Sequence, residues 1–245
     1  MLGKWFKRQD TPSQPSEADK QALLAAAVAK ERAQKPLAGA QLCAKEILNR
    51  VMEGSRTEQG VHVETLFMAL GALAGFACQM SVRAVAVQEG REPAFTVATT
   101  TDGHIRYFGD ALNAPLAEEQ YSVWALAAAG VETAGGTLPD MHDIFRHVAA
   151  TVGTPDFGRP RFPEGTGTGQ APETIIREMW PHLMPMLLQY CGAPPEWPIA
   201  CGIAIQEAIG LASAAIAPGV ACQIAMETAV AMSKIDPAEA GVAVH

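Results

Sequence analysis

Residues 179–233 constrain the fold of this chain more than any other part, because they are almost without charge. They contain three charged side chains at neutral pH, those of Glu196, Glu207 and Glu227, and no lysine or arginine. A segment this apolar must be removed from water, in the protein's own core, against a partner or in lipid. Pro218 interrupts its longest uncharged part, which favours two helices folded back on each other over a membrane span.

The rest of the pattern also predicts helices, because apolar residues recur at helical spacing between Gly and Pro breaks. We expect helices over residues 17–34, 37–53, 62–88, 116–129, 139–152, 173–191, 199–216 and 219–234. We expect the helix over residues 116–129 to end at Gly130. The predicted fold class is therefore mainly α, a multi-helix globular domain with a minor β component.

One β-hairpin is expected near residues 95–108. Asp102 and Gly103 separate two runs rich in β-branched and aromatic residues, and this dipeptide suits a two-residue hairpin turn. Such a turn would place Val97 opposite Phe108. A lone hairpin is marginally stable in water, so we expect it to pack on the helices or pair with another strand.

The helix expected over residues 62–88 is uncharged for eighteen residues and contains Gly71 and Gly75 four positions apart. Its length and this spacing reach the lower limit of a membrane-spanning helix. Its many Ala, Gly and polar residues make it only modestly hydrophobic. We therefore expect a buried helix in close contact with its neighbours.

The chain is predicted to have four parts that together form one compact domain. These are a flexible arm (1–16), a helical half with the hairpin (17–153), a Pro- and Gly-rich loop (154–172) and a C-terminal helical half (173–245). Ser16 has the character of an N-cap for the first helix. A loop this long in a compact domain is usually functional or disordered.

Charge is distributed unevenly along the chain. Residues 1–50 hold nine basic and five acidic side chains, whereas residues 51–245 hold nine basic and twenty-one acidic ones. After Lys45 the only lysine is Lys234. An acidic body repels phosphate, so we expect no nucleic-acid partner. Five scattered cysteines without a paired spacing, and no secretory signal, favour a reducing, cytoplasmic location.

Two carboxylates in the apolar C-terminal part form the first candidate site. Glu207 and Glu227 lie about equally far from the turn at Pro218, so an antiparallel helix pair could bring them to the same height. Two close carboxylates can bind a divalent cation. The alternative is that each reaches solvent or a neighbouring glutamine.

The second candidate site lies on the helix expected over residues 139–152. Asp143 and His147 are four residues apart and share a helix face, as do His142 and Arg146. One face could offer two metal ligands or a histidine held by a carboxylate. A third ligand would come from elsewhere, with candidates His62, Glu64 and His182. Most such mixtures are solvated faces.

The third candidate is an anion site in the long loop. Gly165, Gly167 and Gly169 precede a helix, and Arg159 and Arg161 stand just before them. Backbone N–H groups at a helix start can hold an anion. No strand precedes the glycines and no Walker lysine is present, so a mobile loop is the alternative.

None of these patterns identifies an activity. Our first hypothesis is a non-catalytic helical interaction or assembly protein of the cytoplasm, which forms homo-oligomers or binds a protein partner through its C-terminal helices. An alternative is a metal-binding protein or enzyme near His142, His147 and the Gly-rich loop. Another is a peripheral membrane protein anchored by Trp5 and Phe6, although one aromatic turn binds a membrane weakly. We predict no organic cofactor. The only bound group that these residues would suit is a divalent metal ion.

Overall fold

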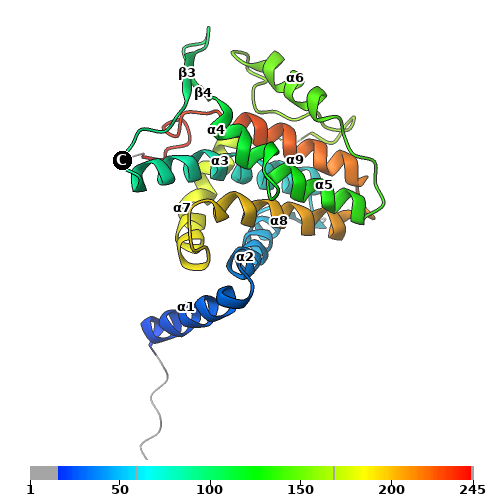
Figure 1. Ribbon diagram of the computed structural model, residues 1–245. Helices are drawn as coiled ribbons and strands as arrows, with labels where there is room; N and C mark the ends of the chain where they lie inside the picture. The colour runs from blue at the N-terminus through cyan, green and yellow to red at the C-terminus, as the bar shows by residue number, and fades with distance from the viewer. Residues whose placement is uncertain (1–15, 59, 168, 244–245) are drawn as a thin grey trace, which may run out of the picture.

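The computed structural model describes residues 16–58, 60–167 and 169–243, and these form a mainly helical fold (Figure 1). The α-helices in this part are α1 (Glu17–Gln34), α2 (Ala38–Gly54), α3 (Val63–Gln88), α4 (Asp110–Asn113), α5 (Val123–Thr133), α6 (Met141–Thr151), α7 (Pro172–Tyr190), α8 (Glu196–Ala212) and α9 (Pro218–Met232). A π-helical turn, η1 (Ala114–Glu118), follows α4. The predicted mainly α class is confirmed. The predicted anchor residues Trp5 and Phe6 lie outside the described residues.

Two small antiparallel sheets accompany the helices. One pairs β1 (Arg56–Thr57) with β2 (Gly60–Val61), and the other is the predicted hairpin, β3 (Thr96–Thr99) and β4 (Ile105–Phe108). The hydrophobic core draws residues from both sides of the loop 154–172, because α3 packs on α7, α8 and α9. The five cysteines are free and buried, as expected for small apolar residues.

Helix α3 lies at the centre of this packing. Among the described residues it alone is long and apolar enough to cross a membrane, and 83% of its most apolar window is buried inside the protein. Neighbouring helices cover it, and Phe76 meets Trp180 of α7 edge to face at 4.9 Å. The predicted buried helix in close contact with its neighbours is therefore confirmed.

The two spaced glycines of α3 allow α9 to approach closely. A Cβ atom at Gly71 would lie 2.2 Å from the carbonyl oxygen of Ala225, and one at Gly75 would lie 2.1 Å from that of Ala229. Any larger residue would collide with the α9 backbone. The glycine spacing thus sets the distance between two core helices.

The apolar C-terminal helices are covered by the chain itself. Helix α8 packs on α2, α3 and α5, and α9 packs mainly on α3. At Gly130 of α5, a Cβ atom would come within 3.0 Å of the Gln206 carbonyl oxygen. Most of the hydrophobicity of residues 179–233 is therefore explained by the protein's own core, although Leu188 and Leu211 remain exposed.

Two predictions of local structure were wrong. The helix expected over residues 116–129 begins later, where Ser122 accepts a hydrogen bond from the Ala125 N–H, and it continues past Gly130 to Thr133. The hairpin pairs Val97 with Tyr107 instead of Phe108. Its loop has three residues ending in Gly103 at φ +88°, and this one extra loop residue shifts the register by one.

Residues after α9 complete the hairpin. The Tyr107 N–H donates to the Lys234 carbonyl oxygen at 2.9 Å, and Arg106 forms a β-bridge with Ile235. The buried Arg106 guanidinium pairs with Glu239 at 2.6 Å. The expectation that the hairpin packs on the body or pairs with another strand is thus confirmed.

Candidate functional site

Several of the residues singled out in the sequence meet where α6 lies on α9. We call the group Asp143, His147, Arg161, Gln223 and Glu227 the Arg161 cluster. Arg161 is at its centre: its Nε lies 2.6 Å from Glu227 Oε1, its backbone N–H donates to Glu227 Oε2 at 2.6 Å, and its Nη2 lies 2.7 Å from Asp143 Oδ2. The cluster joins α6, the long loop and α9.

The remaining members complete the coordination of the Glu227 carboxylate. Gln223 donates its side-chain N–H to Glu227 Oε1 at 3.0 Å, and His147 Nε2 lies 3.8 Å from Oε2. Glu227 is 1% exposed, so its charge depends on these partners instead of water. Glu227, Asp143 and Arg161 were predicted from the sequence to belong to three separate sites, whereas the structure brings them into one.

The charges of the cluster stabilise one another. Hydrogen bonding to Arg161 lowers the pKa of Asp143 below its ordinary value. Burial acts to lower the pKa of Arg161, but its hydrogen bonds to Glu227 and Asp143 outweigh this and raise it. Arg161 therefore stays a cation held between two carboxylates, and the cluster pins α6 and the loop onto α9.

The structure does not supply the third metal ligand expected for Asp143 and His147. Among the described residues no three His, Cys, Asp or Glu side chains are grouped so as to hold a metal ion. His62 instead caps α3 by accepting from the Thr65 N–H. A divalent ion at Asp143 and Glu227 would have to displace the Arg161 guanidinium. The metal hypothesis stays a prediction that the geometry does not favour.

The Glu207 and Glu227 carboxylates do not share a bonding partner. Both oxygens of Glu227 are bonded to Arg161, on the α6 side of α9. Glu207 is half-buried on α8 and makes no hydrogen bond or ion pair within the described part of the chain. For Glu227 the alternative expectation, a hydrogen bond from a neighbouring glutamine, is met by Gln223. Arg161 is a further partner of the same carboxylate.

The residues proposed for an anion site lie on the surface of the loop. Gly165, Gly167 and Gly169 are exposed, and Gly165 occupies a turn at φ +81°. Arg161 is occupied by two carboxylates, and Arg159 is exposed. The structure therefore does not bring the two arginines together as free anion ligands.

A cavity of about 490 Å³ lies along the same α6–α9 boundary, and we call it the Lys234 cavity. Residues of β4, α4, α6 and α9, or directly next to them, line it: Phe108, Gly109, Asn113, Phe145, Val148, Ala149, Val152, Val230 and Lys234. Its size lies in the range of small-molecule sites. Its walls are mainly hydrocarbon and aromatic, and no lining residue is acidic.

Lys234 gives this cavity a polar group without a counter-charge. The residue is 8% exposed, and its Nζ lies 5.5 Å from the centre of the Phe108 ring. Lys234 Nζ has no hydrogen bond or ion pair with the described residues. Burial lowers its pKa to about 8, while nearby Cys78 acts weakly in the opposite direction. A buried ammonium group facing apolar walls is costly unless a ligand compensates it.

Lys234 was not predicted to belong to a site, although one feature of the sequence sets this residue apart. It is the only lysine after Lys45, and it stands at the end of the apolar C-terminal part. A cation in that position must either reach water or be held in the interior. The residues that form its surroundings come from four distant elements, so their convergence was not visible in the sequence.

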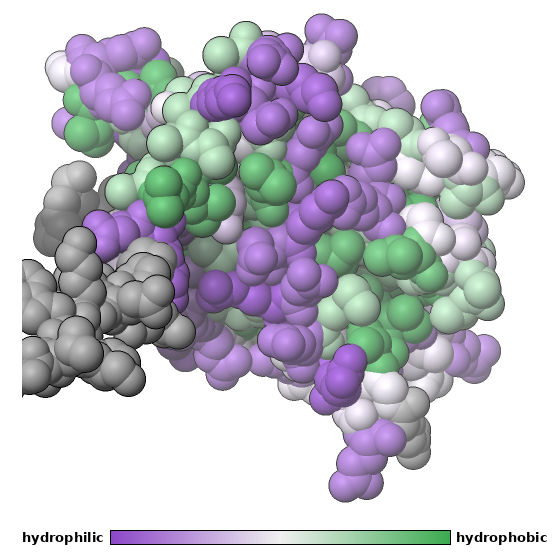
Figure 2. Space-filling model, turned by 90° about the horizontal axis from the view of Figure 1, so that it is seen from below, coloured by the Kyte–Doolittle hydropathy of each residue, from purple (hydrophilic) through white to green (hydrophobic). Residues whose placement is uncertain are grey.

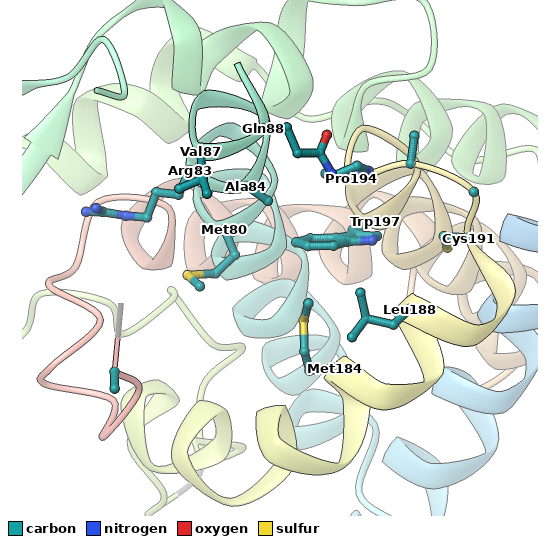
Figure 3. Close-up of a pocket in the computed structure, with 13 residues that line it drawn as sticks. Met80, Arg83, Ala84, Val87, Gln88, Met184, Leu188, Cys191, Pro194 and Trp197 are labelled. Atoms are coloured by element: carbon teal, nitrogen blue, oxygen red, sulfur yellow. The ribbon is translucent and has the colours of Figure 1, made fainter. Parts of the chain in front are cut away.

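A second depression, which we call the Trp197 groove, lies between α3, α7 and the start of α8. It has a volume of about 470 Å³, and Figure 3 shows Met80, Met184 and Trp197 pointing into it. Val87 and Leu188 at its edge are each 63% exposed. Figure 2 shows apolar areas separated by polar residues on the face seen from below.

Comparisons with protein families, with curated proteins and with solved structures found no match to this chain.

Proposed function

We propose that this is a non-catalytic binding protein that holds a small molecule in the Lys234 cavity. The observation that carries the proposal is a buried cation without a counter-charge in a largely apolar cavity of ligand size. An apolar pocket with a few polar groups and an ionisable residue of shifted pKa is the usual form of a ligand site.

The surroundings of the cavity support binding over catalysis. Its lining offers Lys234 and Asn113 as polar side chains but no carboxylate, histidine, serine or cysteine to act with them. General acid–base catalysis requires such a second group within hydrogen-bond reach, whereas a desolvated lysine amine acting alone could serve only as a nucleophile toward a carbonyl compound. The Arg161 cluster has a structural role in this proposal, because it fixes α6 as one wall of the cavity.

Two neighbouring alanines of α6 provide the test. Ala149 and Ala150 are both exposed, but only Ala149 lines the cavity. We expect octanoate or 1-octanol to bind at one site per chain by calorimetry, and we expect Ala149→Trp to block this site. Ala150→Trp should leave binding unchanged. Absence of binding by both probes, or equal binding to both variants, would overturn the proposal.

A second proposal, self-association, follows from α1 and the Trp197 groove. Helix α1 projects from the body (Figure 1), and its Leu23 is 66% exposed. At its base Arg32 pairs with Glu196 at 2.7 Å, next to the groove residue Gly192. Because α1, with its exposed Leu23, ends beside the groove, two copies related by a twofold axis could each place α1 in the other's groove.

Native mass spectrometry tests this second proposal. We expect a dimer that is weakened by Leu23→Glu in α1 and by Leu188→Glu in the groove. Leu211→Glu is the matched control, because Leu211 is 72% exposed on α8 and does not line the groove. A monomeric wild-type protein at tens of micromolar would reject self-association.

A further inference from the structure

We infer that the ligand of the Lys234 cavity is a small apolar monocarboxylic acid, with its carboxylate at Lys234 Nζ and its hydrocarbon part against the aromatic and aliphatic walls. This inference rests on the proposed function and gives the chemical class of its ligand. It follows from the arrangement of charge, hydrocarbon surface and access in the cavity.

The charge requirement comes from Lys234. The residue is 8% exposed, and no acidic residue lines the cavity with it. The nearby ring of Phe108 offers only a weak interaction with the ammonium group at 5.5 Å. A ligand carboxylate would provide the missing counter-charge and a charge-assisted hydrogen bond in a site of low polarity.

A single negative charge fits better than two. Phosphate groups are usually held by several cations or by a row of backbone N–H groups. Lys234 is the only cation in the lining, and Asn113 is the only other polar side chain there. A monocarboxylate needs one cation and can accept a further hydrogen bond from an amide.

The remaining walls determine the rest of the ligand. Phe108 and Phe145 contribute aromatic faces, and Val148, Val152 and Val230 contribute aliphatic ones. Burial of hydrocarbon against such walls is favourable by roughly 25 cal/mol per Å². A volume of about 490 Å³ leaves room for a short alkyl chain or an aryl group. Exposed Ala149 marks the rim by which the ligand enters.

The cavity face of α9 is separate from the face that holds the core. Val230 follows Glu227 by three residues and therefore lies on the same side of α9, which faces α6. Ala225 and Ala229 lie on the opposite side, against α3. A ligand can therefore occupy the cavity without disturbing the packing of α3 on α9.

The test compares octanoate with 1-octanol, which share a chain length and differ in charge. At pH 7 we expect octanoate to bind the wild-type protein at least tenfold more tightly than 1-octanol, by calorimetry. Lys234→Met should remove this preference and leave 1-octanol binding in place. That pattern would establish the carboxylate as the recognised group.

The opposing results separate the ligand class from the proposed function. Equal binding of octanoate and 1-octanol, both blocked by Ala149→Trp, would overturn the acid while the small-molecule site stands. A preference for octanoate that survives in Lys234→Met would also overturn it. Binding of neither compound would overturn the site itself. Octanal trapped on Lys234 by borohydride, without octanoate binding, would replace the acid with a carbonyl compound.

Discussion

Helix α9 has two faces that differ in what they contact. Toward α3 its backbone lies against Gly71 and Gly75, with no space between the helices for a side chain. Toward α6 it presents Glu227 to Arg161 and Val230 to a cavity. On the α3 face the two backbones are in direct contact. On the α6 face Glu227 is ion-paired to Arg161, and Val230 lines a cavity. The contrast indicates that the fold depends on the α3 face, and the α6 face is the one to which our proposal assigns ligand binding.

The largest expected effect is on the α3 face. Gly75→Val should lower the free energy of unfolding by about 4 kcal/mol or more, because its Cβ would collide with the Ala229 carbonyl oxygen. Gly210→Ala is the control, since nothing lies within 4 Å of a Cβ at that α8 position and alanine favours helix. Urea unfolding of both variants measures the difference. Similar midpoints would show that the α3–α9 contact tolerates side chains.

On the α6 face, Lys234→Met should stabilise the protein. The pKa of Lys234 falls from 10.5 to about 8 on folding, and a shift of this size corresponds to up to about 3 kcal/mol. Below pH 8 both states carry the proton, so the folded state bears the full cost of the buried charge. Between pH 8 and 10.5 the unfolded chain binds more protons, so wild-type stability rises with pH.

The gain from Lys234→Met should therefore be greatest below pH 8, fall between pH 8 and 10.5, and be lost above pH 10.5. Thermal unfolding of both proteins at pH 7 and pH 10 measures this change. A variant less stable than wild type at pH 7 would mean that Lys234 has a stabilising partner. Cys78 is the one ionisable side chain that acts on Lys234, and burial raises the pKa of its thiol, which keeps it neutral in this range.

A smaller effect is expected at the Arg161 cluster. Arg161→Ala should destabilise by about 2 kcal/mol, because it leaves the buried Glu227 carboxylate without its main partner. The side chain of Arg161 is 40% exposed, which keeps the effect below that of a fully buried pair. Arg146→Ala is the control, since Arg146 is 72% exposed and should change stability by less than about 0.5 kcal/mol. Equal losses in urea unfolding would contradict the central role of Arg161.

Much of the fold could be predicted because its signals are local. Ser16 caps the helix that follows it, as predicted, and Gly71 and Gly75 indicated a close helix contact. The register of the hairpin was missed because Asp102 and Gly103 suit two turn lengths. The hairpin has the three-residue loop, in which the Thr100 N–H donates to the His104 carbonyl oxygen.

The candidate site could be predicted only in its parts. Asp143, His147, Arg161 and Glu227 were each singled out by residue type, but Arg161 and Glu227 are 66 residues apart and their pairing has no local signal. The Lys234 cavity was missed for the same reason, because β4, α4, α6 and α9 each contribute part of its lining. Spacing along one helix predicts a shared face, but it does not predict which element covers that face.

The contact between α3 and the end of α9 also affects how the chain is made. Gln79 of α3 donates its side-chain N–H to the carbonyl oxygens of Ser233 and Ile235, and Ser233 is 154 residues further along. At roughly 5 to 20 residues per second, the ribosome delivers that partner about 8 to 30 s after α3. During this interval α3, the one helix among the described residues that is long and apolar enough to cross a membrane, has no α9 to cover it. We therefore expect nascent chains halted before α9 to associate with chaperones or aggregate, and full-length release to end that exposure.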